Sequence, residues 1–76
     1  MTNNSNSSPL NINKFGLNLY QLREAKGFTR MRLAEDIGLT DDRIIYYYES
    51  GQKHPTIERA LQIAMVLGVT LDSMFR

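Results

Sequence analysis

Few side chains in this sequence have the types and spacing that catalysis or metal binding requires. The chain has one histidine, His54, and no cysteine, and no serine shares a motif with that histidine, so a nucleophile paired with a base is not indicated. The neighbouring carboxylates Glu35-Asp36 and Asp41-Asp42 would point in different directions on a helix. His54 also lacks the partner four residues away that a helical metal site would use. We therefore expect no enzyme activity, no metal site and no cofactor.

A run of three tyrosines, Tyr46 to Tyr48, offers a different chemistry. Aromatic rings can stack on the bases of single-stranded nucleic acid, at ~1 to 3 kcal/mol per base. Consecutive helical residues rotate about the helix axis, however, and cannot all face one strand. We expect Tyr48 in the core with its hydroxyl at the edge, so single-strand binding is a minor alternative.

The chain is long enough for one domain only, so all of these residues belong to the same domain. The chain has 76 residues, with 42% hydrophobic and 22% charged residues, as in a soluble globular protein. The absence of cysteine fits a reducing cytoplasm. No apolar run approaches the ~18 residues of a membrane span, and the N-terminus does not resemble a signal peptide, so we expect a cytoplasmic protein with no membrane partner. A net charge of +1 is too balanced to indicate nucleic-acid binding by itself.

Charge is distributed unevenly along the chain. Residues 1–13 carry no charged side chain and are mostly Asn and Ser, a composition that buries too little to offset the entropy of chain ordering. All nine basic and eight acidic residues lie in residues 14–76. We therefore predict a flexible arm over residues 1–13 and a folded domain over residues 14–76.

Apolar residues of the domain recur at helical spacing, which predicts an all-α fold. The first helix is expected from about Lys14 to Lys26, ended by Gly27. A short second helix is capped by Thr29 and ends at Gly38. The apolar residues that mark these two helices are Phe15, Leu19, Leu22, Phe28, Leu33, Ala34 and Ile37.

Three further helices are expected after a tight turn at Gly38. Either Thr40 or Asp41 can cap the third helix, which runs to Ser50. A loop containing Pro55 follows, because proline biases its predecessor away from helix. Capping threonines, Thr56 and Thr70, open the fourth helix and a final short one. The predicted inward residues of the fourth are Ile57, Leu61, Ala64 and Leu67, and the last contains Leu71, Met74 and Phe75.

The order of short motifs is more specific than the helix pattern. It runs Phe15-Gly16, Leu22-Arg23, Lys26-Gly27, Leu33-Ala34, Ile37-Gly38-Leu39-Thr40, Glu49-Ser50-Gly51, Pro55-Thr56 and Leu67-Gly68-Val69-Thr70-Leu71-Asp72. This order resembles the phage-repressor-like helix-turn-helix family, often called the XRE family, over about residues 15–75. The resemblance implies an all-α, five-helix bundle of the lambda-repressor-like type with a central helix-turn-helix. It also implies a sequence-specific binder of double-stranded DNA that regulates transcription, with repression the expected outcome.

The sequence departs from the family pattern at two places. Eleven steps separate Gly38 from Glu49, where family members usually have ten. Counting back from Glu49 puts Ile45 and Tyr48 in the core, whereas counting forward from Gly38 puts Ile44 there. In addition, Arg30 stands where glutamine is common in the family. An arginine at this position favours a contact with phosphate over a contact with a base.

In the family, the third helix enters the major groove, so its outward residues are the candidates for reading bases. They are Asp42, Arg43, Tyr46 and Tyr47. Arg43 is the first choice because arginine can pair bidentately with guanine. The tyrosines can reach phosphates, sugars or thymine methyl groups. Asp41 or Asp42 can accept from cytosine or orient Arg43, although capping the helix is the more ordinary role.

Further positions match those that hold the DNA backbone in the family. The phosphate-contact candidates are Arg30, Arg32, Gln52, Lys53 and His54. For each of them the alternative is a solvated surface side chain. Arg23 and Glu49 match the family's ion pair between the first helix and the end of the third, with two unrelated surface charges as the alternative.

A homodimer is expected because one helix-turn-helix contacts one half-site, and two copies reach half-sites ~34 Å apart. Candidates for a two-fold interface are Met65, Met74 and Phe75, with Val66 and Tyr20 nearby, unless these residues only cover the core. The alternative function is a helix-turn-helix used mainly for protein contact, such as an antitoxin-like or regulator-inhibiting module, which the acidic and tyrosine residues of the third helix favour. A protein or peptide effector is possible and is not identified by the sequence.

Overall fold

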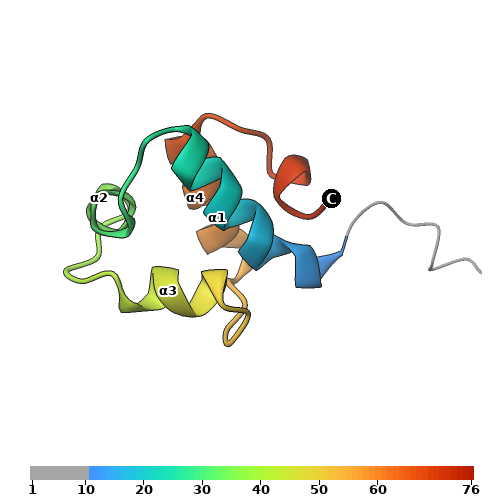
Figure 1. Cartoon of the computed structure of the whole chain (residues 1–76), viewed down its shortest axis with the longest axis horizontal. Helices are drawn as coiled ribbons and strands as arrows, with labels where there is room; N and C mark the ends of the chain where they lie inside the picture. The colour runs from blue at the N-terminus through green and yellow to red at the C-terminus, as the bar shows by residue number, and fades with distance from the viewer. Residues whose placement is uncertain (1–10) are drawn as a thin grey trace, which may run out of the picture.

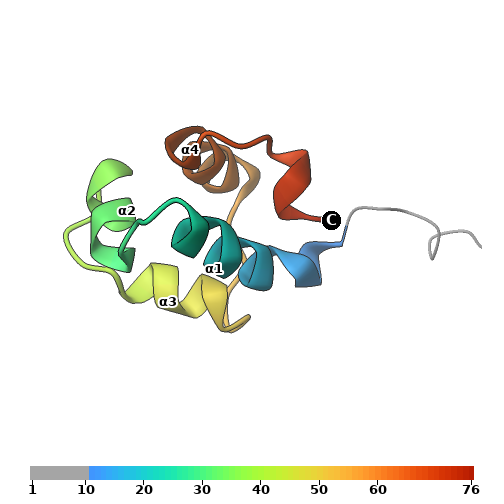
Figure 2. The same cartoon turned by 45° about the horizontal axis from the view of Figure 1, so that its top comes forward.

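A computed structural model describes residues 11–76, and these residues fold into four α-helices and two single turns of 3-10 helix. The chain order is η2 (Ile12–Lys14), α1 (Phe15–Ala25), α2 (Arg30–Asp36), α3 (Arg43–Glu49), α4 (Ile57–Leu67) and η3 (Asp72–Met74). In Figure 2, α1 lies between α3 and α4, and in Figures 1 and 2 α2 stands at one end of the bundle. The expected all-α fold with a central helix-turn-helix is therefore present.

Threonine caps fix where helices begin, as the sequence predicted. The hydroxyls of Thr29 and Thr56 accept hydrogen bonds from the backbone N–H groups of Arg32 and Arg59, at 3.0 and 3.1 Å. Each such cap satisfies one unpaired donor of the first turn and contributes about 1 kcal/mol. Thr70 makes the same contact with the backbone three residues later.

The short final helix expected after Thr70 is a single turn of 3-10 helix, so a count of five α-helices is not confirmed over residues 11–76. The hydroxyl of Thr70 accepts from the N–H of Ser73 in η3, and the N–H groups of Met74 and Phe75 donate to the carbonyls of Leu71 and Asp72, three residues back. Met74 is fully buried against the bundle and Phe75 is partly buried. One turn is long enough to place both side chains on the core.

The extra residue between Gly38 and Glu49 is absorbed before α3 begins. The connection from α2 to α3 spans residues 37–42, longer than the tight turn expected, and α3 starts at Arg43. Ile45 is fully buried and Tyr48 is 7% exposed, whereas Ile44 is only partly buried. Counting back from Glu49 therefore gives the correct core positions.

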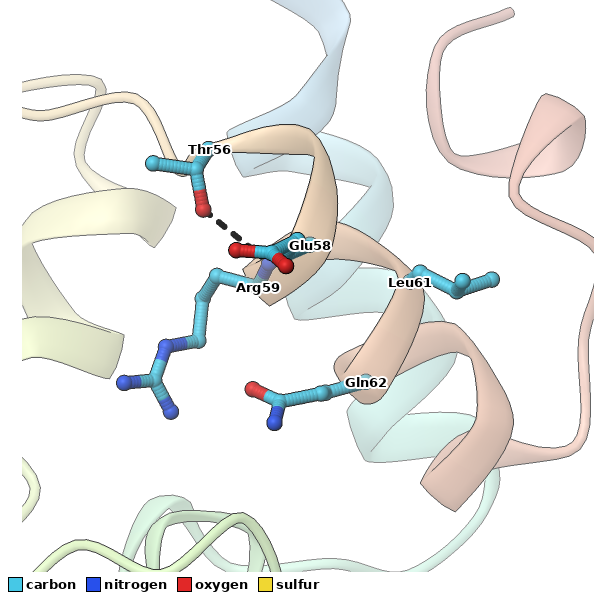
Figure 3. A pocket seen from close by; sticks show the side chains of 5 residues that line it. All are labelled: Thr56, Glu58, Arg59, Leu61 and Gln62. Carbon is cyan, nitrogen blue, oxygen red and sulfur yellow. Dashed lines mark hydrogen bonds between the residues drawn. The ribbon is translucent and has the colours of Figure 1, made fainter.

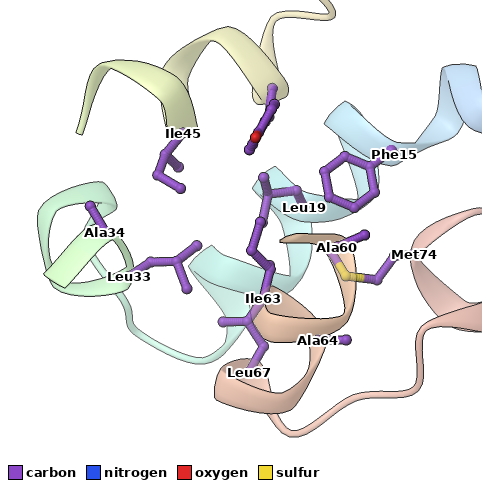
Figure 4. Packing of buried hydrophobic residues seen from close by; sticks show 11 residues of the cluster. Phe15, Leu19, Leu33, Ala34, Ile45, Ala60, Ile63, Ala64, Leu67 and Met74 are labelled. Atoms are coloured by element: carbon purple, nitrogen blue, oxygen red, sulfur yellow. The ribbon is translucent and has the colours of Figure 1, made fainter. Parts of the chain in front are cut away.

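The core is built from all the helices and from η3 (Figure 4). Its largest fully buried side chains are Phe15, Leu19, Leu33, Ile45, Ile63 and Met74. The predicted inward face of α4 is wrong at two positions, because Ile57 is 66% and Leu61 is 45% exposed. The inward face is shifted to Ala60, Ile63, Ala64 and Leu67.

Two close contacts fix the position of α1. A methyl group added to Gly16 would overlap the carbonyl oxygen of Tyr48 and lie 2.9 Å from that of Glu49, so the backbones of α1 and α3 touch at this point. The side-chain amide of Asn18 donates to the carbonyl oxygen of Met74 at 3.0 Å, and so ties α1 to η3.

The start of the described chain is attached to its end. The N–H of Asn11 donates to the carbonyl of Phe75 at 2.6 Å, and the 3-10 turn η2 leads from there into α1. The domain boundary expected at Lys14 falls at the end of this turn, and the boundary itself stays a prediction. Residues 1–10 lie outside the described part, so the arm stays a prediction there.

Candidate nucleic-acid interface

Two tyrosines of α3 lie between two cations in a continuous row. The guanidinium of Arg30, from the start of α2, lies 5.5 Å from the centre of the Tyr46 ring. The Tyr46 and Tyr47 rings are 5.9 Å apart at 60°. The ammonium of Lys53, from the loop after α3, lies 5.8 Å from the Tyr47 ring. We call these four residues the cation–tyrosine row, and each close cation–ring pair contributes about 0.5 to 1 kcal/mol at an exposed site.

The N-terminal end of α3 presents an exposed arginine. The side chain of Arg43 is 78% exposed, and its Nη2 donates to Oδ2 of Asp41 at 3.2 Å. Oδ1 of Asp41 accepts from the backbone N–H of Arg43 at 3.1 Å. These hydrogen bonds lower the pKa of Asp41, with the backbone bond the larger cause, so the carboxylate is ionised at neutral pH. Asp42 stands at the N-cap position without a side-chain cap bond.

The C-terminal end of α3 is held by a buried carboxylate. Glu49, with a side chain 5% exposed, accepts from Nε of Arg23 at 2.6 Å and from Nε of Arg30 at 2.8 Å. Arg23, 4% exposed, also donates to the carbonyl of Phe28 at 2.6 Å. The hydrogen bond to Glu49 is the main cause that raises the pKa of Arg23. The structure thus contains the predicted ion pair and adds Arg30 to it, which links the buried pair to the cation–tyrosine row.

The other phosphate-contact candidates lie on the surface beside α3. Arg32 donates to Asp36 one turn further along α2, at 3.0 Å, so part of its charge is already paired. Gln52 donates to the hydroxyl of Ser50 at 2.8 Å, and His54 is exposed in the same loop as Lys53. The structure therefore brings Arg30 and Lys53 to the tyrosines and leaves Arg32, Gln52 and His54 outside the row.

Sequence reasoning missed three positioning residues. Gly16 and Asn18 make the α1 contacts described above, and Nη1 of Arg59 donates to the carbonyl of Ile37 at 3.2 Å, which ties α4 to the end of α2. Burial raises the pKa of Tyr48, which lies near Arg59. Gly16 was visible as a helix-interior glycine, where alanine would favour the helix more. Neither Asn18 nor Arg59 has a partner at helical spacing, so no local pattern marks them.

The predicted dimer residues divide between the surface and the core. Met65 is 71% exposed, but Met74 is fully buried, so Met74 cannot contact a second copy and that prediction is wrong. Other candidates for the dimer interface lie on α4. These are Ile57, Leu61 and Met65, which recur every four residues along one side of the helix and are all exposed. We call these three residues the α4 stripe. Phe75 packs against the Phe15 ring at 5.2 Å and belongs mostly to the core.

Hollows lie on the surface of the part of the chain that the structure describes. One lies along the first turns of α4 and is lined by Thr56, Glu58, Arg59, Leu61 and Gln62 (Figure 3). A second lies between α1 and α3, where Leu17, Tyr20 and Tyr46 are exposed. Over residues 11–76, no group of histidine or carboxylate side chains is arranged to hold a metal ion. No helix in the same part of the chain is long and apolar enough to cross a membrane.

Comparisons with known proteins agree with this geometry. The profile of a family described as helix-turn-helix matches residues 19–74. The restriction-modification controller protein C.AhdI from Aeromonas hydrophila is 33% identical, with a TM-score of 0.76, and the match covers 84% of this chain and 96% of that one.

Two further solved structures are similar in fold. SinR, a master regulator for biofilm formation solved in complex with DNA, is 24% identical with a TM-score of 0.72, covering 79% of this chain and 95% of that one. The hypothetical transcription factor NHTF from Neisseria is 18% identical with a TM-score of 0.77, covering 100% of this chain and 83% of that one. A search among curated proteins finds no match.

Proposed function

The chain belongs to the helix-turn-helix family, and from this premise we propose that it is a transcriptional regulator that binds double-stranded DNA. The XRE-type resemblance drawn from the sequence motifs is thereby confirmed. Sequence-specific reading of the major groove by α3, repression and homodimerisation are the finer parts of the proposal. Catalysis forms no part of it, and the cytoplasm is the proposed compartment.

The cation–tyrosine row is the observation that carries this proposal. Phosphates line both edges of a major groove, and basic side chains at both ends of the row suit those two edges. The rings of Tyr46 and Tyr47, between the two cations, can contact sugars or thymine methyl groups. Local placement of Arg30 and Lys53 thus compensates for a net charge of only +1.

Base reading is assigned first to Arg43. Its exposed guanidinium can pair with O6 and N7 of a guanine. Asp42, Tyr46 and Tyr47 are the remaining candidates, and Arg32, Gln52 and His54 add weaker contacts to the backbone.

A salt titration tests DNA binding directly. We expect log affinity for a duplex, measured by fluorescence anisotropy, to fall linearly with log salt. Lys53→Ala should reduce the slope by about 0.9 per bound subunit, the value of one lost phosphate contact. Arg76→Ala removes the same charge outside the row, where Arg76 pairs with Asp72, and should leave the slope unchanged. Equal slopes in all three proteins would refute the assignment of the row.

The α4 stripe supports the homodimer. Two copies placed antiparallel about a two-fold axis at Leu61 would set Ile57 against Met65 of the partner, because these residues are equally spaced from Leu61. Leu61→Glu should then shift sedimentation from dimer to monomer. Leu17→Glu is a matched control, because Leu17 is a comparably exposed leucine on α1, and it should leave the dimer intact. A monomeric wild-type protein on DNA would refute this part.

Protein contact is the second candidate function, and the hollow between α1 and α3 favours it. Three exposed apolar side chains there, Leu17, Tyr20 and Tyr46, surround Arg30 and the end of α3. A protein-contact module would show no salt-dependent duplex binding, so the same titration separates the two functions.

A further inference from the structure

Two adjacent aspartates at the start of α3 carry the same charge but differ in geometry. Asp41 contacts Arg43 twice, through the backbone N–H at 3.1 Å and through Nη2 at 3.2 Å. Asp42, one residue closer to the helix, makes no side-chain hydrogen bond to the first turn. The two residues therefore allow a comparison between a carboxylate that is hydrogen-bonded to Arg43 and one that is not.

A free arginine on a DNA-binding surface binds any phosphate, whatever the sequence. If Arg43 left Asp41 for a phosphate, it would exchange one charge-assisted hydrogen bond for another, and the nearby carboxylate would repel the phosphate. Contact with guanine carries no such repulsion, because the edge of the base has only partial charges, and the donors that Arg43 does not use on Asp41 remain available to reach it. Asp41 is thus expected to oppose phosphate contact more than base contact.

We propose that Asp41 is a specificity-determining residue, which acts by positioning the guanidinium of Arg43 and by penalising binding to phosphates of non-preferred DNA. This inference rests on the proposed DNA-binding function. Asp41 lowers affinity for DNA in general, and it increases the ratio between affinity for the preferred site and affinity for other sequences.

The variants Asp41→Asn and Asp42→Asn test the proposal on the full chain. Asparagine keeps an oxygen that can accept from the N–H of Arg43, so the start of α3 is retained while the charge is removed. The probes are a duplex that wild-type protein selects from a random pool and a scrambled duplex of equal length and composition. Melting temperatures of both variants report any loss of folding.

We expect Asp41→Asn to raise affinity for the scrambled duplex about threefold or more and to steepen its salt slope by about 0.9 per bound subunit, as for one added phosphate contact. The ratio of the two affinities should fall about fivefold. Asp42 makes no side-chain hydrogen bond to the first turn, so any effect of Asp42→Asn should persist in an Arg43→Ala background, whereas the effect of Asp41→Asn should be lost there.

Two results would overturn the inference while DNA binding stands. One is a ratio that Asp41→Asn leaves unchanged. The other is an effect of Asp41→Asn that persists in an Arg43→Ala background, since Asp41 would then act on bases directly. Wild-type protein that selects no duplex from the pool would instead refute the proposed function itself.

Discussion

The two ends of α3 use the same chemical pair, an arginine and a carboxylate, in opposite surroundings. At the C-terminal end, Arg23 and Glu49 are 4% and 5% exposed, and Glu49 also accepts a hydrogen bond from Arg30. At the N-terminal end, Arg43 and Asp41 are 78% and 53% exposed. A buried charge that loses its partner is strongly destabilising, whereas an exposed pair adds little to stability. The buried end therefore fixes the helix, and the exposed end is free to serve recognition.

Removal of Glu49 should have the largest effect on stability. Glu49→Ala leaves Arg23 buried without its carboxylate, and we expect a loss of about 3 to 5 kcal/mol in the free energy of unfolding. The measurement is urea unfolding followed by circular dichroism.

Glu24 provides the control for that variant. It also contacts Arg23, at 3.2 Å, but its side chain is 55% exposed, so Glu24→Ala should cost less than about 1 kcal/mol. Similar losses for the two variants would show that the burial of Glu49 does not increase its contribution to stability.

Gly16→Ala tests the backbone contact beside the same buried end. Helix propensity alone predicts stabilisation by about 1 kcal/mol. The overlap with the carbonyl oxygens of Tyr48 and Glu49 predicts the opposite sign, a loss of about 1 to 3 kcal/mol. A rise in the urea midpoint would show that α1 and α3 can separate without cost.

At the exposed end of α3, Arg43→Ala should change DNA affinity much more than stability. We expect the melting temperature to change by no more than ~2 °C, because the side chain is mostly in solvent. Affinity for the preferred duplex should fall about five- to 150-fold, with relaxed preference at one base pair. Equal losses on every sequence would assign Arg43 to phosphate contact.

The smallest expected effect concerns the titration of Asp41. Its pKa should lie below the ordinary value of 3.8, mainly because of the hydrogen bond from the Arg43 backbone, and carbon-detected NMR can measure it. A lowered folded-state pKa gives a stabilising contribution that is present above the ordinary pKa and is lost as pH falls through the folded value. Arg43→Ala, which keeps the backbone bond, should raise the pKa only in part.

The sequence predicted the local features of this molecule better than its long-range ones. Threonine caps and helix-ending glycines depend on residues a few positions apart, so Thr29 and Thr56 were recognised correctly. The inward face of α4 was misplaced because alternative apolar sets fit one helix, and only packing in the shared core cluster selects Ala60 and Ile63 over Ile57.

In the candidate site, too, the sequence predicted local features better than contacts between separate elements. Arg43 and the tyrosines were identified because they lie on the outward side of one helix. The ties that Arg30 and Lys53 make to the tyrosine rings join separate elements, and spacing in the sequence does not report such distances. The resemblance supplied Arg23 and Glu49 as a pair, but the third member, Arg30, needed the folded structure.

The hydrogen bond between Asn11 and the carbonyl of Phe75 has a practical consequence for engineering. It brings both ends of the described chain to one corner, at the opposite end of the molecule's long axis from the start of α3 (Figures 1 and 2). A fluorophore, surface tether or fused protein attached at that corner would stand clear of Arg43. A short peptide bridge between the ends would close the domain into a ring, which could then be reopened in an exposed loop as a circular permutant.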